Sequence, residues 1–321
     1  MGKRSIFGFV LFLTVLILTL GSPLAANDVK SPKADLLGNR SSASENADTA
    51  LYKEIQAYGE KNKIDPVDAK VDRVWKAIPG YNGRMVDIEK SYKNMVQEGK
   101  FDENKIFYKE IQPKIHLEDL EPEPVYRGNP EKPMVALLIN VAWGNEYIPT
   151  MLEVLEKHKL TSTFFFDGSW VKNNPELAKS IKNAGHEIGN HAYSHPDLSG
   201  YSTAQTTEEL EKTNDVIQET LGVKPKWFAP PSGSFNANTV QVARQLGMQT
   251  ILWTVDTVDW RKPETWEMVN RVVGKVENGS MILMHPTQPT AEGLDKIITD
   301  IKAKGYELGT VSKLMSEERI N

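Results

Sequence analysis

From residue 134 onward the chain alternates short apolar runs with amphipathic segments of helical period. Seven runs have the length and composition of buried strands: 134–139, 163–166, 187–190, 226–228, 250–255, 281–284 and 306–311. A pattern typical of a helix separates each run from the next. Because parallel strands need a crossover connection, this order predicts an α/β fold with a parallel sheet. We expect a distorted (β/α) barrel of about seven units, which lacks the full eight.

The first 26 residues have the organisation of a secretory signal. Lys3 and Arg4 precede an unbroken apolar run over residues 6–20, and small residues follow it. The position three residues before a cut would hold Leu24 or Pro23. A small residue is preferred there, so an uncleaved N-terminal anchor stays open as the alternative. In either case we expect the body of the protein to be secreted or otherwise extracytoplasmic.

Composition divides the region between this signal and the α/β region into three parts. Residues 27–50 are rich in Ser, Asn, Asp and Ala, which indicates a flexible tether. Residues 51–120 predict a small α+β module, in which the apolar positions between 71 and 78 fit one helical face that Pro79 ends. Residues 121–133 are proline-rich and predict a linker, after which the domain of residues 134–321 begins.

Charge and cysteine content exclude several classes of function. The formal net charge is -5 and no cluster of Lys and Arg is present, so nucleic acid is not expected as a partner. The chain contains no cysteine, which excludes disulfide scaffolds, cysteine nucleophiles and thiolate zinc sites. Any metal would have to be held by histidine and carboxylate side chains.

Polar side chains follow several of the predicted strands. In a parallel barrel the carboxyl ends of the strands form the functional face. Trp143 follows the first run, His191 and His195 the third, and His285 the sixth. Two carboxylates, Asp256 and Asp259, follow the fifth run together with Trp260. A His-x-x-x-His spacing alone is weak evidence for a functional site. Its position at a strand end, with a third histidine at the same face, favours one. Asp259 either caps the next helix or orients His285, and Trp260 either packs in the barrel or presents a flat wall to a sugar ring.

Six stretches carry a resemblance to a known family: residues 162–168, 185–199, 228–236, 253–260, 279–285 and 305–311. They resemble the polysaccharide deacetylases of the NodB-homology group, carbohydrate esterase family 4, over about residues 133–314. The resemblance implies hydrolysis of N-acetyl groups on cell-wall glycans of the GlcNAc type, peptidoglycan or chitin-like. In that family a divalent metal, usually zinc, is held by one Asp and two His. A second Asp acts as general base and a His as general acid.

Several residues match the family's functional positions. The resemblance implies metal ligands at His191 and His195, a general acid at His285 with Asp259 as its partner, and a substrate pocket walled by Trp260, Ser232 and Pro231.

Three other positions depart from the family pattern. Asn140 stands where the base Asp is expected, Val141 where the metal Asp is expected, and Ala229 where an Arg pairs with the base. Loss of a general base typically lowers the rate by roughly 10²–10⁴. Val141 has no donor atom, so we expect the zinc or other divalent metal to be weakly bound or absent unless Glu146 replaces the missing ligand.

Three functions therefore remain open. The first is a polysaccharide deacetylase of weak or absent activity. The alternative is an inactive, extracytoplasmic module that binds or scaffolds cell-wall glycan. A third is a different metal hydrolase that uses the histidines with Glu146. The altered first motif resembles that of the YlxY-type, sporulation-associated homologues, which implies a cell-wall or spore-wall glycan as partner and membrane contact only through the N-terminal segment.

Overall fold

The computed structural model describes residues 42–320, and side chains from residue 48 onward. The predicted signal or anchor and residues 27–41 of the predicted tether lie outside the described residues. Within 42–320, no helix is both long and apolar enough to cross a membrane. Helix α1, Ser42–Lys61, begins inside the range predicted as a tether, so residues 42–50 are helical instead. The composition missed this because the buried side chains that stabilise the helix, Leu51 and Ile55, come only after the polar segment.

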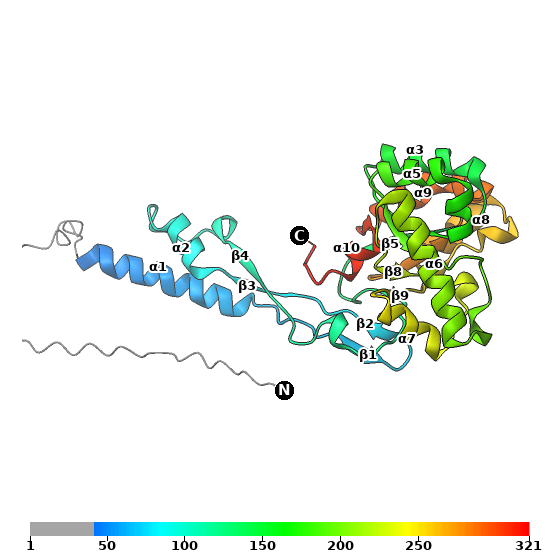
Figure 1. Cartoon of the computed structure of the whole chain (residues 1–321). Coiled ribbons are helices and arrows are strands. Elements are labelled where there is room, and N and C mark those ends of the chain that lie inside the picture. The colour runs from blue at the N-terminus through cyan, green and yellow to red at the C-terminus, as the bar shows by residue number, and fades with distance from the viewer. Residues whose placement is uncertain (1–41, 321) are drawn as a thin grey trace, which may run out of the picture. The chain divides into compact units, whose positions relative to one another are not determined.

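Residues 62–120, the hairpin region, contain two antiparallel strand pairs and a short helix (Figure 1). Strand β1, Lys70–Asp72, pairs with β2, Lys76–Ile78. Strand β3, Gly83–Val86, pairs with β4, Tyr108–Ile111, and helix α2, Ile88–Met95, lies between them in sequence. Two 3-10 turns, η1 (Glu103–Lys105) and η2 (Leu117–Asp119), complete this region.

The helix predicted between residues 71 and 78 is wrong. A hairpin turn occupies these positions, because the Asp72 carboxylate accepts hydrogen bonds from the backbone N–H groups of Val74 and Trp75 at 2.8 Å each. Val71 and Val74 are 49% and 68% exposed. These two residues, which suggested an apolar helical face, therefore lie at the protein surface.

The α/β fold predicted from the sequence is confirmed, and the sheet is a curled, distorted barrel. Its path is β10-β11-β5-β6-β7-β8-β9, and β12 pairs with the start of β5. All of these pairs are parallel. The strands are β5 (Met134–Val141), β6 (Thr163–Phe166), β7 (Glu187–Asn190), β8 (Trp227–Phe228), β9 (Gln249–Thr250), β10 (Val255–Asp256), β11 (Met281–Met284) and β12 (Glu307–Gly309).

The run predicted as one strand over 250–255 is broken in two. Strand β9 pairs with β8 and β10 pairs with β11, at opposite ends of the sheet path. Val125 fills the seam, because its N–H donates to the Thr250 carbonyl at 2.9 Å and its carbonyl accepts from Leu252 N at 2.8 Å. Val125 is fully buried. Part of the predicted proline-rich linker therefore belongs to the barrel wall.

Helices and 3-10 turns connect the strands. They are η3 (Asn145–Tyr147), α3 (Ile148–Lys157), α4 (Gly168–Asn173), α5 (Pro175–Asn183), η4 (Leu198–Gly200), α6 (Thr203–Leu221), η5 (Pro231–Gly233), α7 (Ala237–Gln245), η6 (Asp259–Arg261), α8 (Thr265–Lys275), α9 (Gln288–Ala303) and α10 (Val311–Met315). Local sequence explains the ends of α6: Ser202 and Gln205 form a capping box, and Gly222 ends the helix at φ +68°.

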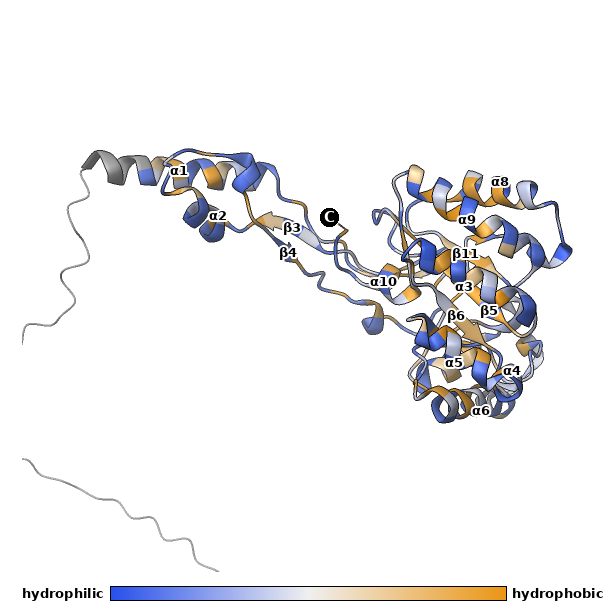
Figure 2. Cartoon of the chain, turned by 90° about the horizontal axis from the view of Figure 1, so that it is seen from above, coloured by the Kyte–Doolittle hydropathy of each residue, from blue (hydrophilic) through white to orange (hydrophobic). Residues whose placement is uncertain are grey.

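The two faces of β5 have different neighbours. Val135, Leu137, Ile139 and Val141 belong to a cluster with apolar side chains of α3, α8 and α9. Alternate residues such as Leu138 belong to the inner cluster. Figure 2 shows β5, β6 and β11 as apolar strands among the helices. By this alternation Asn140 shares the inner face of the barrel, whereas Val141 packs into the helix layer.

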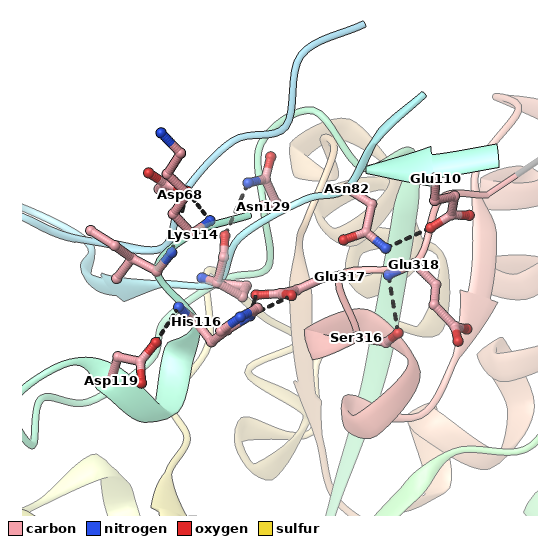
Figure 3. A network of polar contacts seen from close by, with 12 residues as sticks. Asp68, Asn82, Glu110, Lys114, His116, Asp119, Asn129, Ser316, Glu317 and Glu318 are labelled. Atoms are coloured by element: carbon pink, nitrogen blue, oxygen red, sulfur yellow. Dashed lines mark hydrogen bonds and ion pairs between the residues drawn. The ribbon is translucent and has the colours of Figure 1, made fainter. Parts of the chain in front are cut away.

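A polar network joins the hairpin region to the residues that follow α10 (Figure 3). The Glu317 carboxylate contacts His116 Nδ1 at 2.8 Å, and the Glu317 carbonyl accepts from Asn82 N at 2.8 Å. Asn129 donates to the Pro79 carbonyl at 3.0 Å. The hydrogen bond to the Glu317 carboxylate raises the pKa of His116. These contacts link His116 to the residues after α10.

Candidate functional site

The loop after β7 contains two histidines and has a strained backbone, which hydrogen bonds to neighbouring elements stabilise. Ala192 and His195 have φ values of +60° and +55°. Asn190 Oδ1 accepts from Ala192 N at 2.8 Å. Glu209 of α6 accepts from the Ser194 backbone N–H at 2.9 Å and from its hydroxyl at 2.8 Å. Non-glycine residues in this conformation persist only where their surroundings enforce it, and here two neighbouring elements do so.

His191 and His195 lie close together and are held neutral. Their ring centroids are 5.1 Å apart and the rings are inclined at 70°. His191 is 1% exposed, and burial, with a smaller effect from His195, lowers its pKa to about 3. Burial also lowers the pKa of His195. The His191 Nδ1–H donates to the Ala229 carbonyl at 2.7 Å, which leaves Nε2 with its lone pair, the form that metal-binding histidines adopt.

A third metal ligand does not accompany these two imidazoles. Val141 is fully buried among apolar side chains and offers no donor. Glu146 lies in η3 and lines a separate cavity. Within the part of the chain that the structure describes, no group of three His, Cys, Asp or Glu side chains could hold a metal ion. The residues present therefore do not fit the zinc site of the family that the sequence resembles.

Asp167 is the carboxylate beside this loop that the sequence analysis did not identify. It follows β6 and is 3% exposed, and burial raises its pKa. Its Oδ1 accepts from Trp170 N at 2.8 Å and from the Ser169 hydroxyl at 2.6 Å. These contacts occupy it as the cap of α4.

His285 and Asp259 form a buried, hydrogen-bonded pair. His285 Nδ1 lies 2.8 Å from Asp259 Oδ1, and Asp259 Oδ2 accepts from the His285 backbone N–H at 2.6 Å and from the Thr290 hydroxyl at 2.7 Å. Burial raises the pKa of Asp259, but the hydrogen bonds and charge of His285, with the Thr290 bond, outweigh this and the pKa is below its usual value. The carboxylate thus orients the imidazole, as the sequence analysis allowed.

A cavity of about 440 Å³ opens above these groups. It is lined by Asn140, Trp143, His195, Ser232, Trp253, Asp256, Trp260, Leu283 and His285. Trp143 stacks on His285 with ring centroids 5.3 Å apart and an interplanar angle of 15°. Trp260 is 52% exposed, and the Arg261 guanidinium stacks over its ring at 4.7 Å from the centroid. Three indoles therefore surround a small group of polar atoms.

The structure brings together most of the residues singled out in the sequence. Asn140, His195, Ser232, Trp260 and His285 line the cavity. His191 and Asp259 are buried and do not line it, and neither does Pro231, which is buried at the start of η5. The resemblance placed Pro231 in the pocket wall, but only its neighbour Ser232, with φ +55°, reaches the cavity.

Two cavity residues, Trp253 and Leu283, were not identified from the sequence. Trp143 and Asp256 were expected at strand ends of the functional face, without an assigned role in the pocket. Trp143 comes two residues after β5 ends, so its place at a strand end was an available signal. Trp253 lies between β9 and β10, where the sequence predicted one continuous strand.

A second cavity of about 530 Å³ shares Trp143 with the first. Glu146, Lys262, Glu264 and Glu292 are among the residues that line it. Gly144 also lines it and has φ +81°, and a Cβ at this position would lie 1.9 Å from the Pro286 carbonyl oxygen. Only glycine fits this close approach, which brings the loop after β5 against the loop after β11.

Comparisons with known proteins agree with this geometry. Residues 127–251 match the family described as Polysaccharide deacetylase. YlxY of Bacillus subtilis (strain 168) is 56% identical over 270 residues, which cover 84% of this chain and 85% of that protein. The peptidoglycan-N-acetylmuramic acid deacetylase PdaA of the same organism is 33% identical over 201 residues, covering 61% of this chain and 76% of PdaA.

Solved structures of a related protein cover most of this chain. The crystal structure of BA3943, a CE4 family pseudoenzyme from Bacillus anthracis, aligns with a TM-score of 0.79 and 49% identity over 84% of this chain and 96% of that chain. A BA3943 mutant with restored enzymatic activity aligns with the same TM-score and 48% identity, over 84% of this chain and 99% of that chain. The chain described here belongs to the polysaccharide deacetylase family.

Proposed function

We propose that this protein binds cell-wall glycan through the 440 Å³ cavity that Asn140 and three tryptophans line, and that it has little or no deacetylase activity. The observation that carries the proposal is the end of β5, where Asn140 faces the cavity and Val141 packs into the helix layer. A carboxamide does not take up a proton at neutral pH, and a valine side chain coordinates nothing. Both acidic functions that the family places here are therefore missing.

A neighbouring position supports the proposal that the site functions without its acidic residues. Ala229 stands in the position of the arginine that the family pairs with its base, and it is 2% exposed. Losing one partner of a buried ion pair would leave a charge uncompensated, whereas losing both is close to neutral. The likeness to the pseudoenzyme BA3943 supports the same reading.

The cavity has the character of a sugar site. Indole rings present flat apolar faces with one N–H each, and binding pockets combine such walls with a few placed polar groups. The cavity volume of about 440 Å³ lies in the range of small-ligand sites. The relatives named for peptidoglycan deacetylation support a peptidoglycan-type glycan as the partner. We include in the proposal that the protein works outside the membrane, directed or anchored by residues 1–26.

A slow deacetylase is the second candidate, and one observation favours it. His285 Nδ1 and the His285 backbone N–H keep their hydrogen bonds to Asp259, and Nε2 of His191 keeps its lone pair. A metal bound there would polarise an acetyl carbonyl and activate water. The residues of this chain that would hold it are His191 and His195, without the carboxylate that the family supplies. Glu146 lines the other cavity, which argues against a hydrolase built on that residue.

The test measures glycan binding, zinc content and acetate release on the same preparations. We expect the unaltered protein to bind GlcNAc oligomers in calorimetry, to retain little zinc after dialysis, and to release no acetate above background. The double variant Asn140→Asp with Val141→Asp should gain both zinc and acetate release. The matched control is Asn140→Asp with Val141→Asn, which has the same shape but lacks the metal carboxylate. One tightly held zinc and acetate release from the unaltered protein would overturn the proposal in favour of the slow enzyme.

A further inference from the structure

Backbone strain is concentrated in the loops around the two cavities. Within residues 42–320, seven residues other than glycine have a positive φ. Two of them, Lys76 and Lys159, lie away from the cavities. The other five belong to loops that contribute to the cavity walls: Ala192, His195, Ser232, Val258 and Lys262. Residues in this conformation persist only where their surroundings enforce it, and they gather at sites that need a fixed geometry.

Val258 is the least expected of these residues, because a β-branched side chain at φ +52° is a genuine outlier. Hydrogen bonds hold the backbone around it. Asp256 Oδ1 accepts from Val258 N at 2.7 Å, and Arg271 of α8 donates to the Thr257 carbonyl at 2.7 Å. Lys262, with φ +51°, follows η6 directly. Two strained residues therefore enclose the three-residue turn η6.

This short turn holds two neighbouring side chains in very different surroundings. Asp259 is fully buried and bonded to His285, whereas Trp260 is half exposed and lines the 440 Å³ cavity. The Arg261 guanidinium covers one face of the Trp260 ring. An indole has two faces, so the other face remains for a ligand. A large exposed side chain that is ordered before binding avoids the entropy loss that a ligand would otherwise have to offset.

We propose that Val258 and Arg261 are positioning residues that hold Trp260 as a preformed platform for a sugar ring. This inference rests on the proposed function and names the residues that fix one wall of its cavity. Val258 restricts the backbone that carries the indole, because glycine would adopt the same φ without strain but would also allow many other conformations. Arg261 restricts the ring itself through a cation–π contact. Both residues raise affinity without touching the glycan.

The experiment measures binding of the GlcNAc tetramer by calorimetry for Val258→Gly and Arg261→Ala, each with and without Trp260→Ala. We expect Val258→Gly to raise the Kd about fivefold, the effect of a binding-competent loop that falls to about one fifth of the population. Arg261→Ala should raise the Kd about threefold, in the range of an exposed cation–π contact. In the Trp260→Ala background neither change should weaken binding further, because a positioning residue acts only through the side chain that it holds.

Two further measurements separate positioning from a general loss of stability. Hydrogen exchange of residues 258–262 in the free protein should be faster in Val258→Gly than in the unaltered protein. The melting temperature should change little, because relief of strain offsets the greater freedom of glycine in the unfolded chain. Lys159→Gly is the matched control. Lys159 is exposed, has φ +50° and precedes β6, at the opposite end of the strands from the cavity, so its replacement should leave the Kd unchanged.

An unchanged Kd in a folded Val258→Gly variant would overturn the inference and leave glycan binding intact. The same conclusion would follow if Trp260→Ala bound the tetramer as tightly as the unaltered protein, or if the losses simply added in the Trp260→Ala background. If Val258→Gly does not fold, the Arg261→Ala comparison decides in the same way. Failure of the unaltered protein to bind the tetramer would instead overturn the proposed function, and the inference with it.

Discussion

Replacing Val141 with aspartate tests whether the missing metal ligand is the structural reason for a missing metal. Val141 has no exposed surface and packs with the side chains that face α3, α8 and α9. Without metal, the new carboxylate would be a buried charge with no partner. We expect an uncompensated charge of this kind to cost about 3–5 kcal/mol. The lost apolar burial adds about 1.5 kcal/mol.

The size of this effect sets the expected shift in melting temperature. A domain of this size is stable by roughly 5–15 kcal/mol, so a loss of about 5 kcal/mol brings the variant close to unfolding. At about 2–4 °C per kcal/mol, the melting temperature in EDTA should fall by about 10–20 °C. Zinc that binds only the folded state should raise the free energy of unfolding of the variant by about 2.7 kcal/mol at a zinc concentration one hundred times the Kd.

The assay follows thermal unfolding by tryptophan fluorescence, in EDTA and over a zinc titration. Val141→Asn is the matched control, because it has the same shape and no charge; it should melt above Val141→Asp in EDTA and respond little to zinc. If Val141→Asp melted within about 2 °C of the unaltered protein in EDTA, the described packing of Val141 would be refuted. An equal response of both variants to zinc would refute the carboxylate as the ligand that completes the site.

Three further predictions concern stability. Asp259→Asn should lower the free energy of unfolding in urea by about 3–5 kcal/mol, because a buried charged acceptor of His285 is replaced by a group with one accepting atom; a loss below about 1 kcal/mol would contradict this. Gly144→Ala should lower the melting temperature and weaken glycan binding, because its Cβ would meet a carbonyl oxygen at 1.9 Å. Gly247→Ala is the control, with a similar φ of +78° and open space, and equal effects would refute the argument. Burial lowers the pKa of His186 to about 4, against about 6.5 when unfolded, so the unfolded state binds more protons and stability falls as pH decreases from 6.5 toward 4. His186→Gln should reduce this fall by up to about 1.4 kcal/mol per pH unit, and unchanged urea midpoints across that range would contradict it.

The sequence predicted the barrel well because its strands and helices have strong local patterns. The runs at 163–166, 187–190 and 281–284 coincide with β6, β7 and β11. The predicted helix between residues 71 and 78 failed because a local turn, capped by Asp72, leaves Val71 and Val74 exposed and therefore offers no continuous apolar face to bury. The predicted strand over 250–255 failed because barrel closure, a long-range demand, divides it between two different neighbours.

Residue identity by itself determined much of the chemistry. The types at positions 140 and 141 exclude a carboxylate base and a carboxylate ligand in any fold, and the absence of cysteine excludes thiolate chemistry. Only the tertiary structure decided where these residues point: Asn140 toward the cavity, Val141 into the helix layer and Glu146 into a neighbouring cavity. Donor atoms belong to a side chain and can be read one residue at a time. Facing, burial and partners depend on strand register and on contacts between segments far apart in the chain, which local patterns do not encode.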